Sequence, residues 1–309
     1  MNICVSVIVP IYNVSSYIER CTRTLLGQTL QNVEFIFVDD ASPDNSIEKL
    51  ERVIADFPQR KPQIKVLHNK KNLGLAATRF VGMDVAQGDF VIHCDSDDWV
   101  ELNMLEVMYK KAIAEDADIV CCEAVKERID NRSLYSYDYD EETLNNGLLA
   151  LNFREIHIAI WNKLIRRSLF TDHEIHNYEG INMAEDSALT VRLRYYSKKT
   201  VIIHQPFYHY NRLNQHSMIA NANEKSAKEK IRLAALLEEF FRKNNDYQRF
   251  IHVINFYKFE SKQYYIREKR DLKQWRSIYP ECHTDILRFK QLTPIGRIKW
   301  WIIANMPLM

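Results

Sequence analysis

The chain is poor in the two residues that most often interrupt regular structure. Its 309 residues include only 7 glycines and 8 prolines, which excludes collagen-like and low-complexity sequences. The net charge is only +1. No overall field attracts a polyanion, and nucleic acid is not expected as a partner. Apolar residues make up 46% and charged residues 27%, which is typical of a folded chain with a sizeable core.

Features of secreted and membrane-spanning proteins are also missing. The 6 cysteines form no CxxC pair, and several lie in apolar runs, where cysteine acts as a small hydrophobe. The first three residues have no basic stretch of the kind that begins a signal peptide, so we expect a reducing, cytoplasmic location. No run approaches the roughly 20 apolar residues that cross a bilayer.

The near-neutral total conceals an uneven distribution of charge. Residues 1–223 contain 24 basic and 31 acidic side chains, whereas residues 224–309 contain 18 and 10. The chain ends in the short apolar and aromatic segment IGRIKWWIIANMPLM. Such a segment suits an anionic membrane surface, and it suits equally a terminal helix packed on its own core. Our working expectation is peripheral contact with the inner face of the cell membrane.

The first 122 residues alternate between two hydrophobic periodicities. Apolar, often β-branched runs predict strands at residues 4–9, 33–38, 64–68, 90–94 and 119–122. Apolar residues at helical spacing predict helices at 15–27, 44–57, 75–86 and 102–114. This alternation predicts an α/β fold, a mostly parallel sheet with helices on both faces. The pattern is helical from about residue 224, so we expect one domain over 1–220 and a helical region over 221–309.

Polar side chains follow three of the predicted strands. They are Asn13 after the first, Asp39 and Asp40 after the second, and Asp95, Ser96, Asp97 and Asp98 after the fourth. Ligands of parallel sheets bind outside the carboxyl ends of the strands, so these positions predict a site. Mg²⁺ and Mn²⁺ commonly bind one or two carboxylates together with substrate phosphates. The DSDD segment therefore predicts such an ion with a phosphorylated ligand; the plainer alternative is that these aspartates cap the next turn.

Two common phosphate-binding motifs are absent. The sequence has no GxxxxGK[ST] segment and no GxGxxG after a strand. A diphosphate would therefore be held by the metal and by basic side chains. Arg79 and Arg212, the latter near His209, are the candidates.

Seven short motifs occur in order and resemble one family. VSVIVPIYN, FVDDASPDNS, NLGLAATRF and FVIHCDSDDW, which begin at residues 5, 37, 72 and 90, are similar to motifs of the inverting glycosyltransferases of family 2, which have the GT-A fold. WNKLIRRSLF, AED and YHYNRLNQHS, which begin at residues 161, 184 and 208, resemble the bacterial members that build cell-surface polysaccharides. The resemblance covers residues 1 to about 220.

The resemblance implies a nucleotide-sugar donor, most often UDP-linked, and a glycan or lipid-linked acceptor. It also implies a role for individual residues. For the donor, Pro10, Tyr12 and Asn13 would line the nucleoside pocket, Asp39 would hydrogen-bond the uracil edge, and Asp95 with Ser96 would contact the ribose side. Arg79 would lie near base and phosphate, Asp97 would bind the metal, and His209 and Arg212 would close on the diphosphate. Asp186 would be the catalytic base. Trp161, Lys163 and Glu185 would lie near the acceptor or donor sugar, although a core position explains Trp161 equally well.

The chemistry of the residues agrees with this family. Glycosyl transfer needs a neutralised leaving group, which a metal and an arginine supply, and a base for the acceptor hydroxyl. Asp186 lies at a predicted helix start, so its plainer interpretation is a helix cap. Thr78 and Phe80 flank Arg79 where the family commonly has alanine and asparagine, which leaves the donor preference open.

Three other functions compete with this interpretation. A phosphatase of the HAD type also uses Asp-x-Asp at a strand end, but places it on its first strand. A sugar nucleotidyltransferase needs a glycine-rich basic loop after strand one, and PIYNVSS is neither glycine-rich nor basic. A sugar-nucleotide-binding regulator or inactive homologue is the third, and the presence of both Asp97 and Asp186 argues against it.

Overall fold

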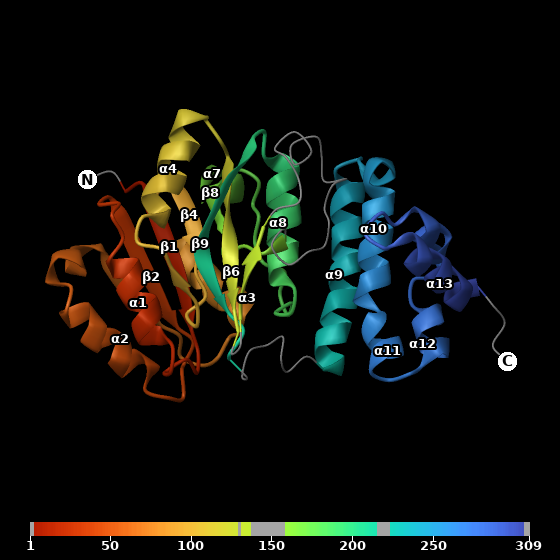
Figure 1. Ribbon diagram of the computed structural model, residues 1–309, viewed down its shortest axis with the longest axis horizontal. Coiled ribbons are helices and arrows are strands. Elements are labelled where there is room, and N and C mark those ends of the chain that lie inside the picture. Colours follow the sequence, from red (N-terminus) through yellow and green to blue (C-terminus); the bar gives the residue numbers. More distant parts are fainter. Residues whose placement is uncertain (1–2, 129–130, 137–157, 215–222, 306–309) are drawn as a thin grey trace. The chain divides into compact units, whose positions relative to one another are not determined.

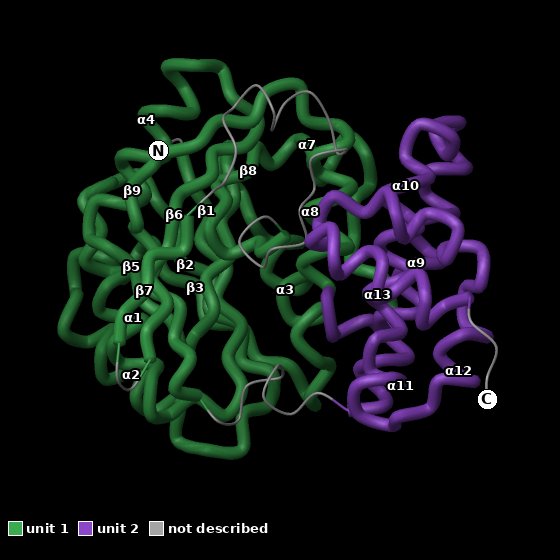
Figure 2. Tube along the Cα trace, turned by 45° about the vertical axis from the view of Figure 1, so that its right-hand side comes forward, with its two compact units in different colours: residues 1–147, 154–179, 185–216 green, residues 148–153, 180–184, 217–309 purple. Residues whose placement is uncertain are grey.

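The structure, a computed structural model, describes residues 3–128, 131–136, 158–214 and 223–305 (Figure 1). The chain divides into two compact units (Figure 2). The first comprises residues 1–147, 154–179 and 185–216, and the second comprises residues 148–153, 180–184 and 217–309. The boundary that we expected at residue 220 falls outside the described residues.

The first unit is built on one sheet. Its strands are β1 (Val5–Ile11), β2 (Val33–Asp39), β3 (Ile64–His68), β4 (Phe90–His93), β5 (Trp99–Val100), β6 (Ile119–Glu127), β7 (Arg132–Tyr135), β8 (Lys163–Arg166) and β9 (Thr200–Asn211). They lie in the order β3-β2-β1-β4-β8-β6-β9-β5, with β7 beside β6. The first four strands pair in parallel, as do β6 and β9. The predicted α/β fold with a mostly parallel sheet is confirmed.

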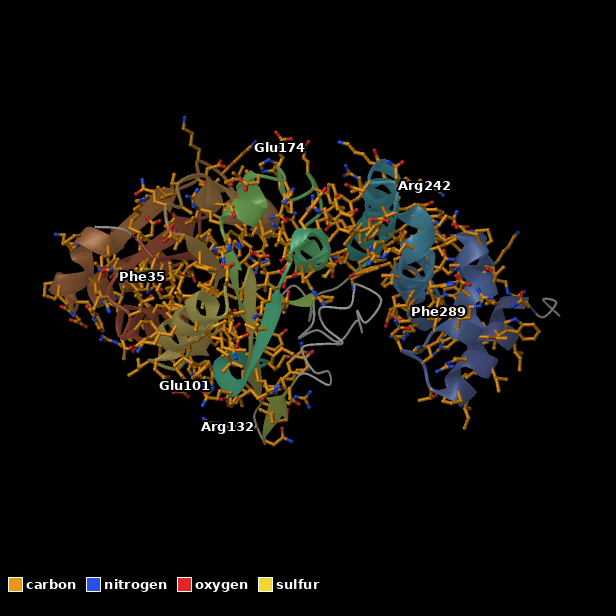
Figure 3. All side chains as sticks on the ribbon, turned by 90° about the horizontal axis from the view of Figure 1, so that it is seen from above. Phe35, Glu101, Arg132, Glu174, Arg242 and Phe289 are labelled. Atoms are coloured by element: carbon orange, nitrogen blue, oxygen red, sulfur yellow. The ribbon has the colours of Figure 1, made fainter. Side chains whose placement is uncertain are left out.

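Helices cover both faces of this sheet. They are α1 (Ile18–Leu26), α2 (Ser46–Ala55), η1 (Pro58–Gln63), α3 (Leu75–Asp84), α4 (Met104–Ala114), α7 (Ser168–Thr171) and α8 (Glu185–Tyr196). Side chains of α1, α2 and α4 pack with Phe35 on one face of β2, which is labelled in Figure 3. Side chains of α3, α7 and α8 pack with Ile36 on the opposite face. Successive strand residues thus enter separate cores, as strand geometry requires.

The strands after residue 122 were not predicted. β8 is antiparallel and lies between β4 and β6, and the short β5 pairs with the far end of β9. Sequence reasoning had assigned no element to residues 158–170 or 201–212. Alternation with helices, the signal used for the first four strands, does not extend to antiparallel insertions. β9 nevertheless matters for the site, because its register with β5 sets His209 opposite Trp99.

The second unit is helical, as predicted. It contains α9 (Glu224–Lys243), α10 (Tyr247–Ser261), α11 (Gln263–Arg267), α12 (Leu272–Ser277), η3 (Pro280–Arg288) and α13 (Pro294–Asn305). Aromatic rings dominate its core. The ring centroids of Phe289, labelled in Figure 3, and Phe259 are 5.4 Å apart, and those of Trp300 and Trp275 are 5.6 Å apart. Within the described parts of both units, no helix is both long and apolar enough to cross a membrane.

Candidate functional site

The loop after β4 holds carboxylates that have few positive partners. Asp98 is 1% exposed; it accepts hydrogen bonds from the Tyr208 hydroxyl and from the Asn211 N–H, both at 2.7 Å. Asp97 accepts one bond, at 2.8 Å, from Nδ2 of Asn214. Burial and the neighbouring carboxylates raise the pKa of Asp97 to about 6 and that of Asp98 well above its ordinary value. Negative charge on these two carboxyl groups is therefore poorly compensated.

Arg79 on α3 gathers carboxylates from two distant segments. Its Nη2 lies 2.5 Å from Oδ1 of Asp95, and its Nη1 lies 2.6 Å from Oε1 of Glu185 and 2.5 Å from Oδ1 of Asp186. The guanidinium is 1% exposed, whereas Asp95 and Asp186 are 25% and 20% exposed. Burial lowers the pKa of Arg79, but the three carboxylates outweigh it and raise that pKa well above its ordinary value. Arg79 is thus a permanent buried cation with two partly exposed anions.

Asp186 lies in the first turn of α8, so the predicted helix start at this position is confirmed. The residue before the helix, Ala184, has φ +68, a conformation that costs a non-glycine residue free energy and that often occurs at functional sites. Burial and the charge of Asp186 raise the pKa of neighbouring Glu185 well above its ordinary value. Asp186 is the more exposed of the two side chains.

The end of β1 lies beside the end of β2. Ile11 pairs with Asp39, and Pro10 is buried on the same strand. The Tyr12 side chain beyond the strand end is 48% exposed. Asn13 has φ +54 and donates its N–H to Ser42 Oγ at 2.9 Å. The two strand ends therefore place an exposed aromatic residue and a carboxylate at the same edge of the sheet.

Asp39 is already engaged by two groups of the protein. Its Oδ1 accepts the N–H of Ser42 at 2.8 Å, and its Oδ2 lies 3.0 Å from Nδ1 of His68. The His68 side chain is 54% exposed. A ligand that hydrogen-bonds Asp39 would therefore share it with His68 or displace that side chain.

His209 and Arg212 flank the other side of the DSDD loop. His209 lies 2.9 Å from Glu127 through Nδ1 and 2.9 Å from Glu101 through Nε2, and its ring stacks on Trp99 with the centroids 5.0 Å apart. Arg212 is exposed and donates from Nη1 to the Tyr210 hydroxyl at 3.1 Å. The structure thus orients the His209 ring with two glutamates.

Trp161, Lys163 and Ser96 are among the predicted site residues that the fold buries. Trp161 is 3% exposed and stacks on Tyr208 with ring centroids 4.4 Å apart, as the alternative core position for this residue expects. Lys163 is 1% exposed; its Nζ donates to the Ala159 carbonyl at 2.5 Å and to Asn162 Oδ1 at 2.9 Å. Burial lowers the pKa of Lys163 to about 8. Ser96 is likewise 5% exposed.

A family model for glycosyl transferase family 2 matches residues 6–173, which is more than half of the chain. The chain belongs to glycosyl transferase family 2. The glycosyltransferase GlyG of Streptococcus pneumoniae is 31% identical over 223 residues, which are 69% of this chain and 72% of that protein. The cholesterol galactosyltransferase of Borreliella burgdorferi is 30% identical over 282 residues, 85% of this chain and 76% of that protein. This protein is accordingly a glycosyltransferase.

Solved structures of other glycosyltransferases share the fold. Residues 1–349 of S. aureus TarS, in complex with UDP-GlcNAc, superpose with a TM-score of 0.70 at 20% identity, over 97% of this chain and 90% of that one. The mannosyltransferase PcManGT of Pyrobaculum calidifontis, in complex with GDP-Man and Mn²⁺, gives 0.56 at 15% identity, over 98% and 86%. The architecture is that of GT-A glycosyltransferases.

The donor set of this glycosyltransferase fits a divalent cation that is shared with a ligand. In the described segments, no group of three or more His, Cys, Asp or Glu side chains is placed to hold a metal by itself. Asp97 nevertheless offers a carboxylate whose raised pKa reflects unfavourable negative charge. A hard cation bound through one or two carboxylates and completed by phosphate oxygens is the usual arrangement for Mg²⁺. Asp97 would hold such an ion.

Sequence reasoning missed the residues that support the DSDD loop. The Tyr208 hydroxyl accepts a hydrogen bond from the Asp95 N–H at 3.1 Å and donates one to the Asp98 carboxylate. Asn211 donates from Nδ2 to the Asp97 carbonyl at 3.0 Å, and Asn214 binds the Asp97 side chain. All three lie in the segment YHYNRLNQHS. The family resemblance had singled out that segment, but only for His209 and Arg212.

Proposed function

We propose that this glycosyltransferase moves one sugar from a UDP-sugar, with inversion and with a divalent metal, onto a hydroxyl of a glycan or lipid-linked acceptor. The observation that carries the proposal is the cluster in which one buried guanidinium, that of Arg79, joins Asp95 and Asp186. It links a carboxylate of the predicted donor site to the predicted base. The complex of TarS with UDP-GlcNAc supports the choice of donor.

Asp186 is the proposed catalytic base. Its carboxylate takes the proton of the acceptor hydroxyl while that oxygen attacks the anomeric carbon from the face opposite the nucleotide. Attack from that face inverts the configuration. Glu185, which is paired with Arg79 through Oε1, would lie near the sugar. Trp161 and Lys163 would support the sugar site from the core, because both are buried.

The proposed donor site extends along the carboxyl edge of the sheet. Pro10, Tyr12 and Asn13 would line the nucleoside pocket, Asp39 would bond the uracil edge, Asp95 and Ser96 would contact the ribose, and His209 and Arg212 would close on the diphosphate. Asp97 would bind Mn²⁺ or Mg²⁺, which when bound neutralises charge on the leaving diphosphate. Arg79 gives three hydrogen bonds to carboxylates, so we propose that it acts on base and phosphate by holding Asp95 and Asp186.

Calorimetry with UDP tests this site. Wild type is titrated with UDP with and without Mn²⁺, beside Asp97→Ala and the control Asp172→Ala, which removes an exposed aspartate outside the site. We expect metal-dependent binding in wild type and in the control, and its loss in Asp97→Ala. An affinity for UDP that is the same with and without Mn²⁺ would refute the proposed role of the metal. Metal-dependent UDP binding without turnover of any UDP-sugar would favour a sugar-nucleotide-binding regulator or an inactive homologue.

We also propose that α13 brings this enzyme to the inner surface of the cell membrane, where lipid-linked acceptors of surface polysaccharides lie. Four apolar residues of α13 are exposed, although Ala304 of the same helix is buried: Ile295, Ile298, Trp301 and Ile302, at 80%, 56%, 42% and 40%. Residues 286–305 contain four basic and no acidic side chains. An exposed apolar stripe with basic neighbours is typical of helices that lie in the interface of an anionic membrane.

Vesicle flotation tests this surface, with phosphatidylglycerol-containing vesicles compared with neutral phosphatidylcholine vesicles. Point substitutions are preferable to truncation, because Trp300 of α13 packs on Phe259 and Trp275 in the core. We expect Ile298→Asp with Ile302→Asp to lower the fraction bound to anionic vesicles at least fivefold, as lost apolar contact and added like charge both oppose binding. The control Leu134→Asp alters a side chain of β7 that is 60% exposed. Equal binding by all three proteins would refute the role of α13.

A further inference from the structure

A small cavity lies beside the Arg79 cluster in the first unit. Its volume is about 10 Å³, which is about the space that one water molecule requires. Three of its lining residues have polar side chains: Arg79, His93 and Asn177. The others form an apolar wall: Phe80, Met83, Phe170, Ile175 and Leu189.

Each of the three polar residues places an unsatisfied atom in this region. Nε of Arg79, both ring nitrogens of His93 and Oδ1 of Asn177 are buried and have no hydrogen-bond partner among the described residues. Such atoms are rare in folded proteins, because burying them unpaired is unfavourable. Their occurrence around one cavity indicates a common partner. A water molecule needs two to four polar neighbours to be stably buried, and this cavity provides three.

We propose that the cavity holds one water molecule that bridges Arg79 Nε, one ring nitrogen of His93 and Asn177 Oδ1, and that His93 is thereby a positioning residue for Arg79. The water accepts the Nε–H of Arg79 and donates to Asn177 Oδ1. His93 either donates to it or accepts from it, according to its tautomer. The catalytic consequence rests on the proposed function, since Arg79 matters there through Asp95 and Asp186.

The surroundings fix the partners of this water. Asn177 donates from Nδ2 to the Ala76 carbonyl of α3 at 2.8 Å, which fixes one end of its amide. His93 is 2% exposed at the end of β4, where it pairs with Ile8 of β1. Burial and the nearby charge of Arg79 hold the pKa of His93 well below its ordinary value, so the ring is neutral. A neutral imidazole adds no second positive charge beside the guanidinium.

The bridging water gives the Arg79 guanidinium a hydrogen-bond partner at Nε. Nη1 and Nη2 of Arg79 are engaged by Asp95, Glu185 and Asp186, whereas its Nε has no hydrogen-bond partner among the described residues. Because the guanidinium is planar, a contact at Nε fixes the direction of all its other N–H groups. His93 thus helps to set the orientation of Asp95 and Asp186.

Two measurements on the full chain test the bridge. A high-resolution crystal structure of wild type should show an ordered water within about 2.7–3.2 Å of Nε, a His93 nitrogen and Asn177 Oδ1. In solution, the ¹⁵N-labelled Arg79 Nε–H, identified by its loss in Arg79→Lys, should exchange slowly and give a cross-peak to bound water. A dry cavity, or His93 bonded directly to Nε, would overturn the proposal.

Variants separate positioning from packing. His93→Leu fills similar space without a polar atom, His93→Gln keeps one, and Met83→Leu changes an apolar lining residue as the matched control. We expect exchange of the Nε–H to quicken at least tenfold and the water cross-peak to vanish in His93→Leu. We expect His93→Gln to stay within threefold of wild type and Met83→Leu to be unchanged. Equal effects of all three variants would show a packing role and overturn the proposal.

The test is independent of the donor. UDP binding with Mn²⁺ is measured in parallel on wild type. A wild type that shows the water but binds no UDP would refute the proposed function and leave the water bridge standing. A wild type that binds UDP but shows no water would refute only the bridge.

Discussion

Two aspartate-rich loops leave the same edge of the sheet and differ in how their carboxylates are paired. After β2, Asp40 accepts bonds from the Gly74 N–H at 2.9 Å and the Leu73 N–H at 2.8 Å. Asp44 accepts from the Ser15 N–H and the Ser42 hydroxyl, at 2.8 and 2.7 Å. Each carboxylate of this loop ties together two parts of the chain.

The same residue type after β4 is poorly compensated. Burial alone would raise the pKa of Asp44, but the bonds from Ser46 and Ser42 outweigh it and lower that pKa far below the ordinary value. Burial also raises the pKa of Asp97, to about 6, and there the bond from Asn214 is too little to reverse it. The comparison teaches that hydrogen-bond donors near a carboxylate, rather than its position at a strand end, decide how well its negative charge is compensated.

The largest effect is expected from removing Arg79, the buried cation of α3 that pairs with Asp95 of the loop after β4. Arg79→Leu leaves Asp95, Glu185 and Asp186 close together and mostly buried, so the free energy of unfolding should fall by about 3–5 kcal/mol. Denaturant unfolding measures this. The control Arg23→Leu removes an ion pair with Asp56 in which both side chains are more than half exposed, and it should cost under about 1 kcal/mol. Similar losses in the two variants would contradict the central role of Arg79.

The next effect concerns catalysis. Asp186→Asn keeps the shape of the side chain but cannot take a proton, so transfer from the donor that wild type uses should slow by roughly 10²–10⁴. The free energy of unfolding should not fall, because two carboxylates still face Arg79. Release of UDP measures the rate, with Asp172→Asn as the charge-matched control. A variant that retained more than a tenth of the rate would exclude Asp186 as the base.

The unfavourable negative charge on buried Asp97 predicts a stabilising substitution. A carboxyl group whose folded pKa of about 6 exceeds its ordinary 3.8 destabilises the protein above pH 6, and this cost disappears as the pH falls toward 4. Asp97→Asn should therefore raise the free energy of unfolding by on the order of 2 kcal/mol at pH 8 and hardly at all at pH 4. It should also abolish stabilisation by Mn²⁺ with UDP. Equal free energies of unfolding for variant and wild type at pH 8 would show that the Asp97 charge does not destabilise the protein.

The smallest effect tests the other loop. Asp44→Asn replaces one acceptor oxygen by a donor that faces the Ser15 N–H, and should cost about 1–2 kcal/mol at neutral pH. Because the folded pKa of Asp44 is lowered, the advantage of wild type is complete above its ordinary pKa and declines as the pH falls below about 4. The pH dependence is thus opposite in sign to that of Asp97→Asn. The same sign in both variants would erase the distinction between the loops.

Local patterns in the sequence determined much of this protein. The four parallel strands, their intervening helices and the helical C-terminal unit were all predicted, because apolar periodicity depends only on neighbours along the chain. The family motifs predict the site residues through the resemblance. The exposed face of α13 was harder to predict, because the sequence does not distinguish Trp300 from Trp301. In the structure Trp300 stacks on Trp275 in the core, whereas Trp301 is exposed.

Only the tertiary structure decided the surroundings of the site residues. Glu185 and Asp186 lie 106 and 107 positions from Arg79 along the chain, and the Asp98 carboxylate lies 110 positions from the Tyr208 that supports it. The common core of α3 and α8 and the pairing of β9 with β5 bring these groups together, and no local period encodes these contacts. Burial of Trp161 and Lys163 and the polar cavity beside His93 follow from the same long-range packing, because burial is a property of the whole fold.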